Sequence, residues 1–327
     1  MKPKVLLTRR LPAKVVDLLK ENFELSVNPY DRALTREEFL SAARGMDGLL
    51  PLLTERIDGE ALDAAGPGLK IVANHAVGFN NIDVPAATAR GVAVTNTPDV
   101  LTDTTADLAL ALMLAVARRV PEGDRICRGG SFPEWNPQFM LGADVHHKTL
   151  GLIGLGRVGR AVAKRAAGFG MKLIYAPHGE CPQGGVDPVS GAKCLSLDEV
   201  LAQADFLSLH VPLTEETHHL LGAAELAKTK PSAFLINTAR GPVVDEQALV
   251  EALDANRLAG AGLDVFENEP QIHPGLVGRD NVVLLPHVGS ATAETRIAMG
   301  IKAATNLIAL LIKGEEPPDC LNPQVLA

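Results

Sequence analysis

The sequence has no cluster of lysine and arginine residues anywhere along its 327 residues. Its formal net charge is −8. A protein that binds nucleic acid normally presents a basic patch to the phosphates. We therefore expect no nucleic-acid partner.

Long apolar runs are also missing. The longest run, residues 108–117, falls well short of the ~20 residues needed to span a bilayer, and the charged residues Asp107 and Arg118 flank it. Such a run fits a buried helix. The N-terminus carries charges and a proline instead of the apolar centre of a signal peptide. We expect a cytoplasmic protein without a membrane partner.

Cysteines are few and carry no recognisable spacing. The four of them are Cys127, Cys181, Cys194 and Cys320. They form no Cys-x-x-Cys pair and no metal-ligand pattern, so reduced thiols are expected in a cytoplasm. The paired histidines at 146–147 and 218–219 have no partner at ligand spacing. The sequence therefore predicts no metal site.

What the chain does contain is a regular alternation of short apolar segments and amphipathic helices. Hydrophobic residues make up 46% and charged residues 21%, as in soluble globular proteins, and the length allows two domains. The first 97 residues predict strands at residues 5–7, 23–27, 48–53, 70–73 and 92–95. Strands that alternate with helices indicate βαβ units and a parallel sheet.

A Gly-x-Gly-x-x-Gly motif stands in the middle of the chain, at Gly154, Gly156 and Gly159. An apolar run precedes it, and a helix rich in small residues and a second apolar run follow. Gly154 permits the turn, Gly156 lets a pyrophosphate approach the backbone, and Gly159 lets the helix pack on the sheet. Arg157 and Val158 open the helix, whose free amides face the phosphates. The motif predicts dinucleotide binding; a glycine-rich turn without a ligand is the alternative.

The expected ribose-binding carboxylate is missing about 20 residues after the glycines. The second strand there ends Tyr175-Ala176-Pro177-His178. A protonated His178 could pair with a 2′-phosphate, although it could equally be a surface histidine, and Glu180 lies close by. The sequence leans to NADP(H) over NAD(H) and leaves both open.

The position of the motif predicts two doubly wound α/β domains, one inserted into the other. Residues 99–287 are expected to form a Rossmann dinucleotide-binding domain. Residues 1–98 and 288–327 are expected to form a flavodoxin-like substrate domain, with a closing helix at 291–313. A helix from Thr102 to Arg118 is apolar nearly all round, which predicts burial on several sides. We expect it to link the domains and to pack against a second subunit.

Three segments follow predicted Rossmann strands, where doubly wound folds bind ligands, and they supply Arg240, Glu269 and His287. Hydride delivery to a 2-keto acid needs a guanidinium for the carboxylate and the carbonyl. It also needs an acid for the developing alkoxide and a carboxylate that keeps a histidine protonated. The three residues match these needs. A surface arginine and a buried histidine bonded to backbone are the alternatives.

Over essentially its whole length, the chain resembles the D-isomer-specific 2-hydroxyacid dehydrogenases. The matching segments are residues 72–83, 95–98, 100–106, the glycine motif, 237–241, 262–265 and 286–292. The resemblance implies that Val77 and Gly78 give backbone amides to the substrate carboxylate, and that Ser290 lies with them. It also implies that Arg240 binds substrate, Glu269 partners the histidine and His287 is the acid/base. The implied lining of the cofactor cleft is Thr105, Gly154 through Gly159, His178, Pro212, Thr238, Asp264 and Gly289.

Within that family the chain looks most like the glyoxylate/hydroxypyruvate reductases. Leu53 lies in a segment similar to their first substrate loop, and Trp135 in one similar to a loop that reaches the neighbouring subunit's active site. Packing of Trp135 inside its own subunit is the other interpretation. The resemblance implies reduction of glyoxylate to glycolate and of hydroxypyruvate to D-glycerate, NAD or NADP as cofactor, and a homodimer.

Three alternatives share the fold. A 3-phosphoglycerate dehydrogenase would need an extra arginine or lysine in the first loop to bind the substrate phosphate. This chain has Leu52-Leu53-Thr54 there. A phosphite dehydrogenase would want a lysine near Val77. A co-repressor that senses the dinucleotide could keep all three catalytic residues and act as a binding protein.

Overall fold

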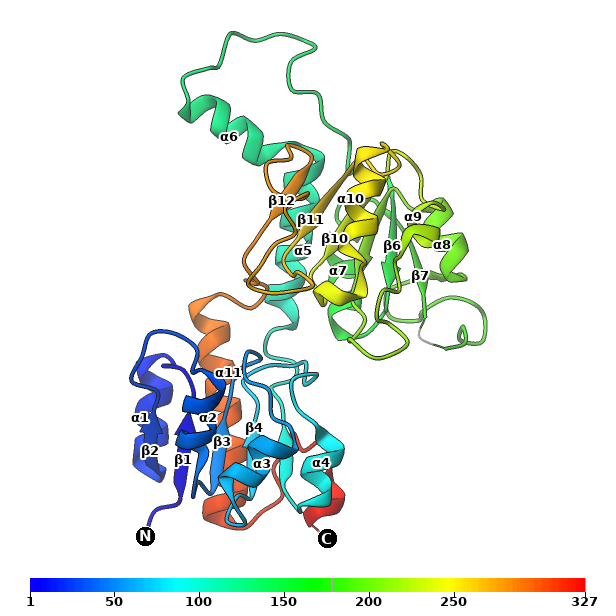
Figure 1. The fold of residues 1–327 in the computed structure, drawn as a ribbon. Helices are drawn as coiled ribbons and strands as arrows, with labels where there is room; N and C mark the ends of the chain where they lie inside the picture. Colours follow the sequence, from blue (N-terminus) through cyan, green and yellow to red (C-terminus); the bar gives the residue numbers. More distant parts are fainter. Residues whose placement is uncertain (178, 327) are drawn as a thin grey trace. The chain divides into compact units, whose positions relative to one another are not determined.

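The computed structural model describes residues 1–177 and 179–326, and the chain divides into two compact units (Figure 1). The first unit comprises Met1–Leu101 together with the chain from Ser290 on, and the second is Thr102–Gly289. The cofactor contact predicted at His178 lies outside the described residues. Each unit is built on a parallel sheet, which confirms the predicted α/β class.

The first unit contains a five-stranded sheet in the order β2-β1-β3-β4-β5. Its strands are β1 (Lys4–Leu7), β2 (Glu24–Val27), β3 (Gly48–Leu50), β4 (Ile71–Ala73) and β5 (Ala93–Thr95). All neighbours pair in parallel. This is the flavodoxin-like order, so ligands are expected at the carboxyl ends of these strands.

Most α-helices of the first unit begin at a capping side chain. These α-helices are α1 (Ala13–Asn22), α2 (Arg36–Ala43), α3 (Gly59–Ala65), α4 (Val84–Ala89) and α11 (Ala293–Ile308). At α2, Thr35 and Glu38 form the capping box that their spacing predicts. One helical stretch of the described residues, Ala293–Lys313, has the length and the mean hydropathy of 1.4 of a candidate membrane span. Its Ala303 and Leu307 lie in the core of the unit, as in a core helix.

The second unit contains a seven-stranded sheet in the order β12-β11-β10-β9-β6-β7-β8. Its strands are β6 (Thr149–Ile153), β7 (Lys172–Ala176), β8 (Lys193–Cys194), β9 (Phe206–Leu209), β10 (Phe234–Asn237), β11 (Gly260–Leu263) and β12 (Val282–Leu284). All neighbours pair in parallel. The strand order reverses between β6 and β9, the point at which doubly wound sheets open a ligand crevice.

The apolar helix predicted from Thr102 is α5 (Thr102–Ala117), and it packs on the sheet and on α7 (Arg157–Ala167). Leu112 and Met113 are almost fully buried in this contact, which confirms burial on several sides. The sequence did not predict α6 (Val120–Arg128), which extends with the following segment away from the sheet of its own unit (Figure 1). The other helices of the second unit are α8 (Leu197–Gln203), α9 (Ala223–Leu226), α10 (Glu246–Asp254) and the 3₁₀ helix η1 (Gly241–Val243).

Cys181 and Cys194 form a disulfide with 5.8 Å between their Cα atoms. The prediction of four reduced thiols is therefore wrong for these two, whereas Cys127 and Cys320 are free. The chain turns back after β7, and β8 returns beside it, which brings the two sulfurs together. That return is a tertiary event that spacing alone does not indicate.

The same segment is tied to α7 by an ion pair. Arg160 Nη2 lies 2.7 Å from Asp187 Oδ1, and the guanidinium holds the pKa of the Asp187 carboxyl well below its usual range. Asp187 also accepts the amide hydrogen of Ser190 at 2.8 Å. The segment after β7 is thus fixed to the helix that opens at the glycine motif.

Candidate active site

The glycine motif forms a tight turn from β6 into α7. Gly154 has φ +92°, and a Cβ there would lie 2.9 Å from the backbone of His210. A Cβ on Gly159 would lie 2.4 Å from the carbonyl oxygen of Gly154. A Cβ on Gly156, by contrast, would meet nothing within 4 Å. Open space therefore lies beside Gly156 at the amino end of α7, a position that suits the pyrophosphate of a dinucleotide.

The other predicted cofactor residues of this unit follow strands of the same sheet. Pro212 comes after β9 and is exposed, and Thr238 comes after β10 and is buried. Arg157 and Val158 open α7. Since the carboxyl ends of parallel strands meet at one edge, these residues share the edge that carries the glycine turn.

Asp264 fixes the chain that follows β12. Its two carboxylate oxygens accept the amide hydrogens of Val288 at 2.7 Å and Gly289 at 2.8 Å. Thr105 Oγ1 donates to the carbonyl of Gly289 at 3.2 Å. Asp264 is only 1% exposed, and burial raises the pKa of its carboxyl. The structure thus uses Asp264 to position the segment that carries His287.

His287 and Glu269 come together directly. The distance from His287 Nδ1 to Glu269 Oε2 is 2.8 Å, and the other carboxylate oxygen accepts the amide hydrogen of Phe266 at 3.1 Å. Burial raises the pKa of Glu269, but the hydrogen bond and the charge of His287 outweigh it and leave this pKa below its ordinary value. His287 Nε2 makes no hydrogen bond to the described residues, so it is the nitrogen available to a ligand.

Arg240 leaves β10 in a loop shaped by Asn237. The Asn237 side chain donates to the carbonyl of Arg240 at 2.9 Å and accepts the amide hydrogen of Ala239 at 3.0 Å. Burial lowers the pKa of Arg240, while the charge of Glu269 opposes that shift. An arginine still remains protonated at neutral pH. The charge of Arg240 therefore lies close enough to Glu269 to lower the pKa of its carboxyl.

A close backbone approach locks the Arg240 loop against the Glu269 loop. A Cβ on Gly241 would lie 1.9 Å from the carbonyl carbon of Phe266. The two loops are therefore in direct contact at the ends of β10 and β11. This contact, with the next strand β12 leading to His287, gathers the three predicted catalytic residues at one edge of the sheet.

Sequence reasoning missed a pair of glutamates behind this site. The amide hydrogen of Glu246 goes to Glu267 Oε2 at 3.1 Å, and the amide hydrogen of Glu267 goes to Glu246 Oε1 at 2.8 Å. Burial raises the pKa of Glu246, and His219 bonds to Glu267. These contacts brace the turn that carries Glu269. Only the density of acidic residues at 245–246 and 267–269 could have suggested them.

The predicted substrate residues Leu53, Val77, Gly78 and Ser290 belong to the first unit, and all four are partly exposed. Leu53 follows β3, and Val77 and Gly78 follow β4, at the carboxyl ends of adjacent strands. Trp135, of the second unit, is 81% exposed. It therefore does not pack inside the second unit.

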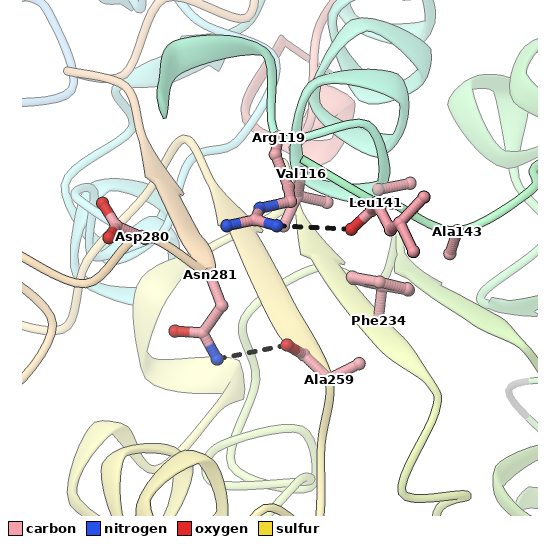
Figure 2. Close-up of a pocket in the computed structure, with 10 residues that line it drawn as sticks. Val116, Arg119, Leu141, Ala143, Phe234, Ala259, Asp280 and Asn281 are labelled. Atoms are coloured by element: carbon pink, nitrogen blue, oxygen red, sulfur yellow. Dashed lines mark hydrogen bonds between the residues drawn. The ribbon is translucent and has the colours of Figure 1, made fainter. Parts of the chain in front are cut away.

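A cavity of about 310 Å³ lies at the opposite end of the second sheet (Figure 2). Phe234, Ala259 and Asn281, at the amino ends of β10, β11 and β12, line it. Arg119 donates to the carbonyl of Leu141 at 3.3 Å across its rim. The predicted catalytic residues follow the carboxyl ends of these strands, so the cavity lies away from them.

Comparison with known proteins identifies the family. Residues 110–289 match the family described as D-isomer specific 2-hydroxyacid dehydrogenase, NAD binding domain. The chain is 49% identical to a glyoxylate reductase of Thermococcus onnurineus, over 100% of this chain and 98% of that protein.

Two solved structures are similar along the whole chain. A glyoxylate reductase from Paecilomyes thermophila is 36% identical with a TM-score of 0.88, covering 99% of both chains. An NADPH-dependent glyoxylate/hydroxypyruvate reductase from Sinorhizobium meliloti, solved with NADP and malonate, is 35% identical with a TM-score of 0.84, covering 98% of this chain and 97% of that one. This chain belongs to the D-isomer-specific 2-hydroxyacid dehydrogenase family.

Proposed function

We propose that this protein reduces glyoxylate to glycolate, and hydroxypyruvate to D-glycerate, with NADPH or NADH. The observation that carries the proposal is the contact of 2.8 Å between His287 Nδ1 and Glu269 Oε2, at the sheet edge that also bears Arg240 and the glycine turn. Full-length similarity to glyoxylate reductases supports the choice of substrate.

Each catalytic residue has one task in this proposal. Arg240 binds the carboxylate of the keto acid and polarises its carbonyl. His287 donates the proton on Nε2 to the carbonyl oxygen as the alkoxide develops. Glu269 holds Nδ1 and favours the imidazolium form. A nicotinamide dinucleotide held at the glycine turn would supply the hydride for the carbonyl carbon. One hydride and one proton convert the keto acid into the hydroxy acid.

For the cofactor, we propose that NADPH is accepted at least as well as NADH. No carboxylate stands at the end of β7, in Tyr175, Ala176 or Pro177, to repel a 2′-phosphate. The Sinorhizobium meliloti relative is NADPH-dependent. The open space at Gly156 fits the pyrophosphate that the two cofactors share.

We also propose a homodimer built on α6 and the segment after it. None of the residues of α6 is buried, and Val120, Phe132, Trp135 and Leu141 are all more than half exposed. An apolar surface of this kind usually marks a binding site. In this arrangement Trp135 reaches the substrate site of the partner subunit.

Sedimentation of the protein checks this arrangement. We expect the wild-type protein to sediment as a dimer and Val120→Glu to shift it towards the monomer, because a charge would be buried without a partner. Lys2→Glu, a change at an exposed position of the first unit, serves as the control. A wild-type protein that stays monomeric at micromolar concentration would contradict the proposal.

One panel of assays tests the proposed reaction. Both cofactors are measured against glyoxylate, hydroxypyruvate, pyruvate and phosphohydroxypyruvate. We expect the highest kcat/KM with glyoxylate or hydroxypyruvate. A preference for phosphohydroxypyruvate would instead favour the 3-phosphoglycerate alternative. Cofactor binding without turnover of any substrate would favour a dinucleotide-sensing binding protein.

The Glu269→Gln variant tests the pairing with His287. Reduction needs a proton on His287, and the carboxylate stabilises that imidazolium whereas the neutral amide does not. In the variant the high-pH limb of the reduction profile is therefore expected to move to lower pH. The measurement is kcat/KM as a function of pH, with Glu180→Gln as the control. A limb that stays in place would refute the pairing.

A further inference from the structure

Three successive carbonyl groups in the turn after β4 are held by buried donors. The carbonyl of Ala76 accepts the amide hydrogen of Thr97 at 2.9 Å. The carbonyl of Val77 accepts from Asn96 Nδ2 at 2.7 Å. The carbonyl of Gly78 accepts from Asn74 Nδ2 at 3.0 Å. The carbonyl groups of Ala76, Val77 and Gly78 are therefore all fixed in orientation.

This anchoring decides where the next three amide hydrogens point. In a planar trans peptide the carbonyl of one residue and the amide hydrogen of the next point in opposite directions. The amides of Val77, Gly78 and Phe79 are therefore turned away from Thr97, Asn96 and Asn74. Within residues 1–177 and 179–326, none of the three amide hydrogens finds an acceptor. Val77 and Gly78 are partly exposed and Phe79 is exposed, which leaves this turn accessible to a ligand.

We propose that Asn74 and Asn96 are positioning residues that preorganise this turn as a cradle for the substrate carboxylate. The inference rests on the proposed reaction and adds to it the two side chains that aim the amides. Successive amide groups that converge on one side bind anions through fixed dipoles. Their strength depends on orientation before the ligand arrives, and that orientation is what the two asparagines supply.

The surroundings of both asparagines fit this role. Asn96 is 8% exposed and Asn74 is fully buried, so each amide is shielded from water and holds one rotamer. Asn74 also bonds to Asn81, with 3.1 Å between Nδ2 and Oδ1. Asn81 Nδ2 in turn donates to the carbonyls of Leu52 and Glu55 at 3.1 Å each. The cradle is thus joined to the loop that carries Leu53.

The neighbouring imidazole does not supply the positive charge. His75 is 2% exposed, and burial, helped by the charge of Arg296, lowers its pKa to about 4. It is therefore neutral at pH 7. His75 therefore adds no positive charge to attract an anion. Binding of a carboxylate in this turn depends instead on the orientation of the amide hydrogens of Val77, Gly78 and Phe79.

The test compares Asn96→Leu and Asn74→Leu with the wild-type holoenzyme. Leucine has nearly the shape of asparagine but cannot donate, so the carbonyl loses its anchor and the peptide can turn. We expect the KM for glyoxylate and the Kd of oxamate, a carboxylate that mimics a keto acid, to rise by about 10- to 100-fold. That is the range for a weakened hydrogen bond to a charged group. We expect the KM for NADPH and kcat to change by less than about 3-fold, because neither asparagine belongs to the glycine turn or to the pair of His287 and Glu269.

Asn322→Leu is the matched control. Asn322 is 1% exposed in the same unit, accepts the amide hydrogen of Val94 at 2.8 Å, and donates to Thr88 and Val92 instead of to the turn carbonyls. It should lose stability without a change in KM. If the leucine variant at position 96 fails to fold, Asn96→Asp replaces it in the test, because aspartate keeps the shape of asparagine and loses the donor. An unchanged KM and oxamate Kd in the folded Asn96 and Asn74 variants, or an equal rise in Asn322→Leu, would overturn the inference. If the wild-type protein binds oxamate but does not reduce glyoxylate, the proposed reaction fails, and the oxamate Kd of the variants still decides the cradle.

Discussion

Replacing His287 with asparagine is expected to lower kcat for glyoxylate reduction by on the order of 10²-fold or more, the range for losing a general acid. Asparagine can still donate an amide hydrogen to Glu269, so the carboxylate that now lies 2.8 Å from Nδ1 keeps a partner. It has no titratable proton for the carbonyl oxygen. Steady-state kinetics with glyoxylate and NADPH give the measurement.

The same variant should leave cofactor binding nearly intact. The glycine turn that is expected to hold the pyrophosphate lies on β6 and α7, and His287 is not among its contacts. The Kd of NADPH, measured by fluorescence, should therefore stay within about 3-fold of the wild-type value. His146→Asn, at an exposed histidine, controls for the loss of any imidazole. Near-normal turnover in His287→Asn would remove this residue from the mechanism.

Local patterns predicted the parts of this protein that depend on neighbours in sequence. Thr35 and Glu38 are three residues apart, and their capping box needs nothing beyond that spacing. Gly154 and Gly159 predict a turn, because only glycine tolerates the backbone contacts that surround these two positions. The positions of Arg240 and His287 followed from the rule that parallel strands deliver their carboxyl ends to one edge.

Contacts between segments that are distant in the sequence could not be predicted from such local patterns. Glu246 and Glu267, 21 residues apart, each donate a backbone amide hydrogen to the side-chain carboxylate of the other, and their spacing has no motif. The bond from Asn96 to the carbonyl of Val77 depends on β4 and β5 being neighbours. Even when the order of the strands is known, the direction of an amide side chain is set by packing. The disulfide of Cys181 likewise needs the return of β8.

The second large effect is expected at Gly241, a residue without chemistry of its own. In Gly241→Ala the new Cβ would lie 1.9 Å from the carbonyl carbon and 2.0 Å from the carbonyl oxygen of Phe266, and 2.5 Å from the amide nitrogen of Glu267. All three are backbone atoms, so no side chain can rotate to make room. The two loops must separate by on the order of 1 Å, and a misplacement of that size can cost ~10²-fold in rate. We expect kcat/KM for glyoxylate to fall by about that factor.

Because the contact joins the loop of Arg240 to the turn of Glu269, the variant should damage both functions at once. The KM for glyoxylate should rise as Arg240 moves, and kcat should fall as Glu269 leaves Nδ1 of His287. Gly222→Ala is the matched control, since a Cβ there meets only ordinary contacts, the nearest at 3.5 Å from Glu225 Oε2. A folded Gly241→Ala enzyme with wild-type kinetics would show that the loops can part without cost. The coupling between the guanidinium and the acid/base pair would then lie elsewhere than in this backbone contact.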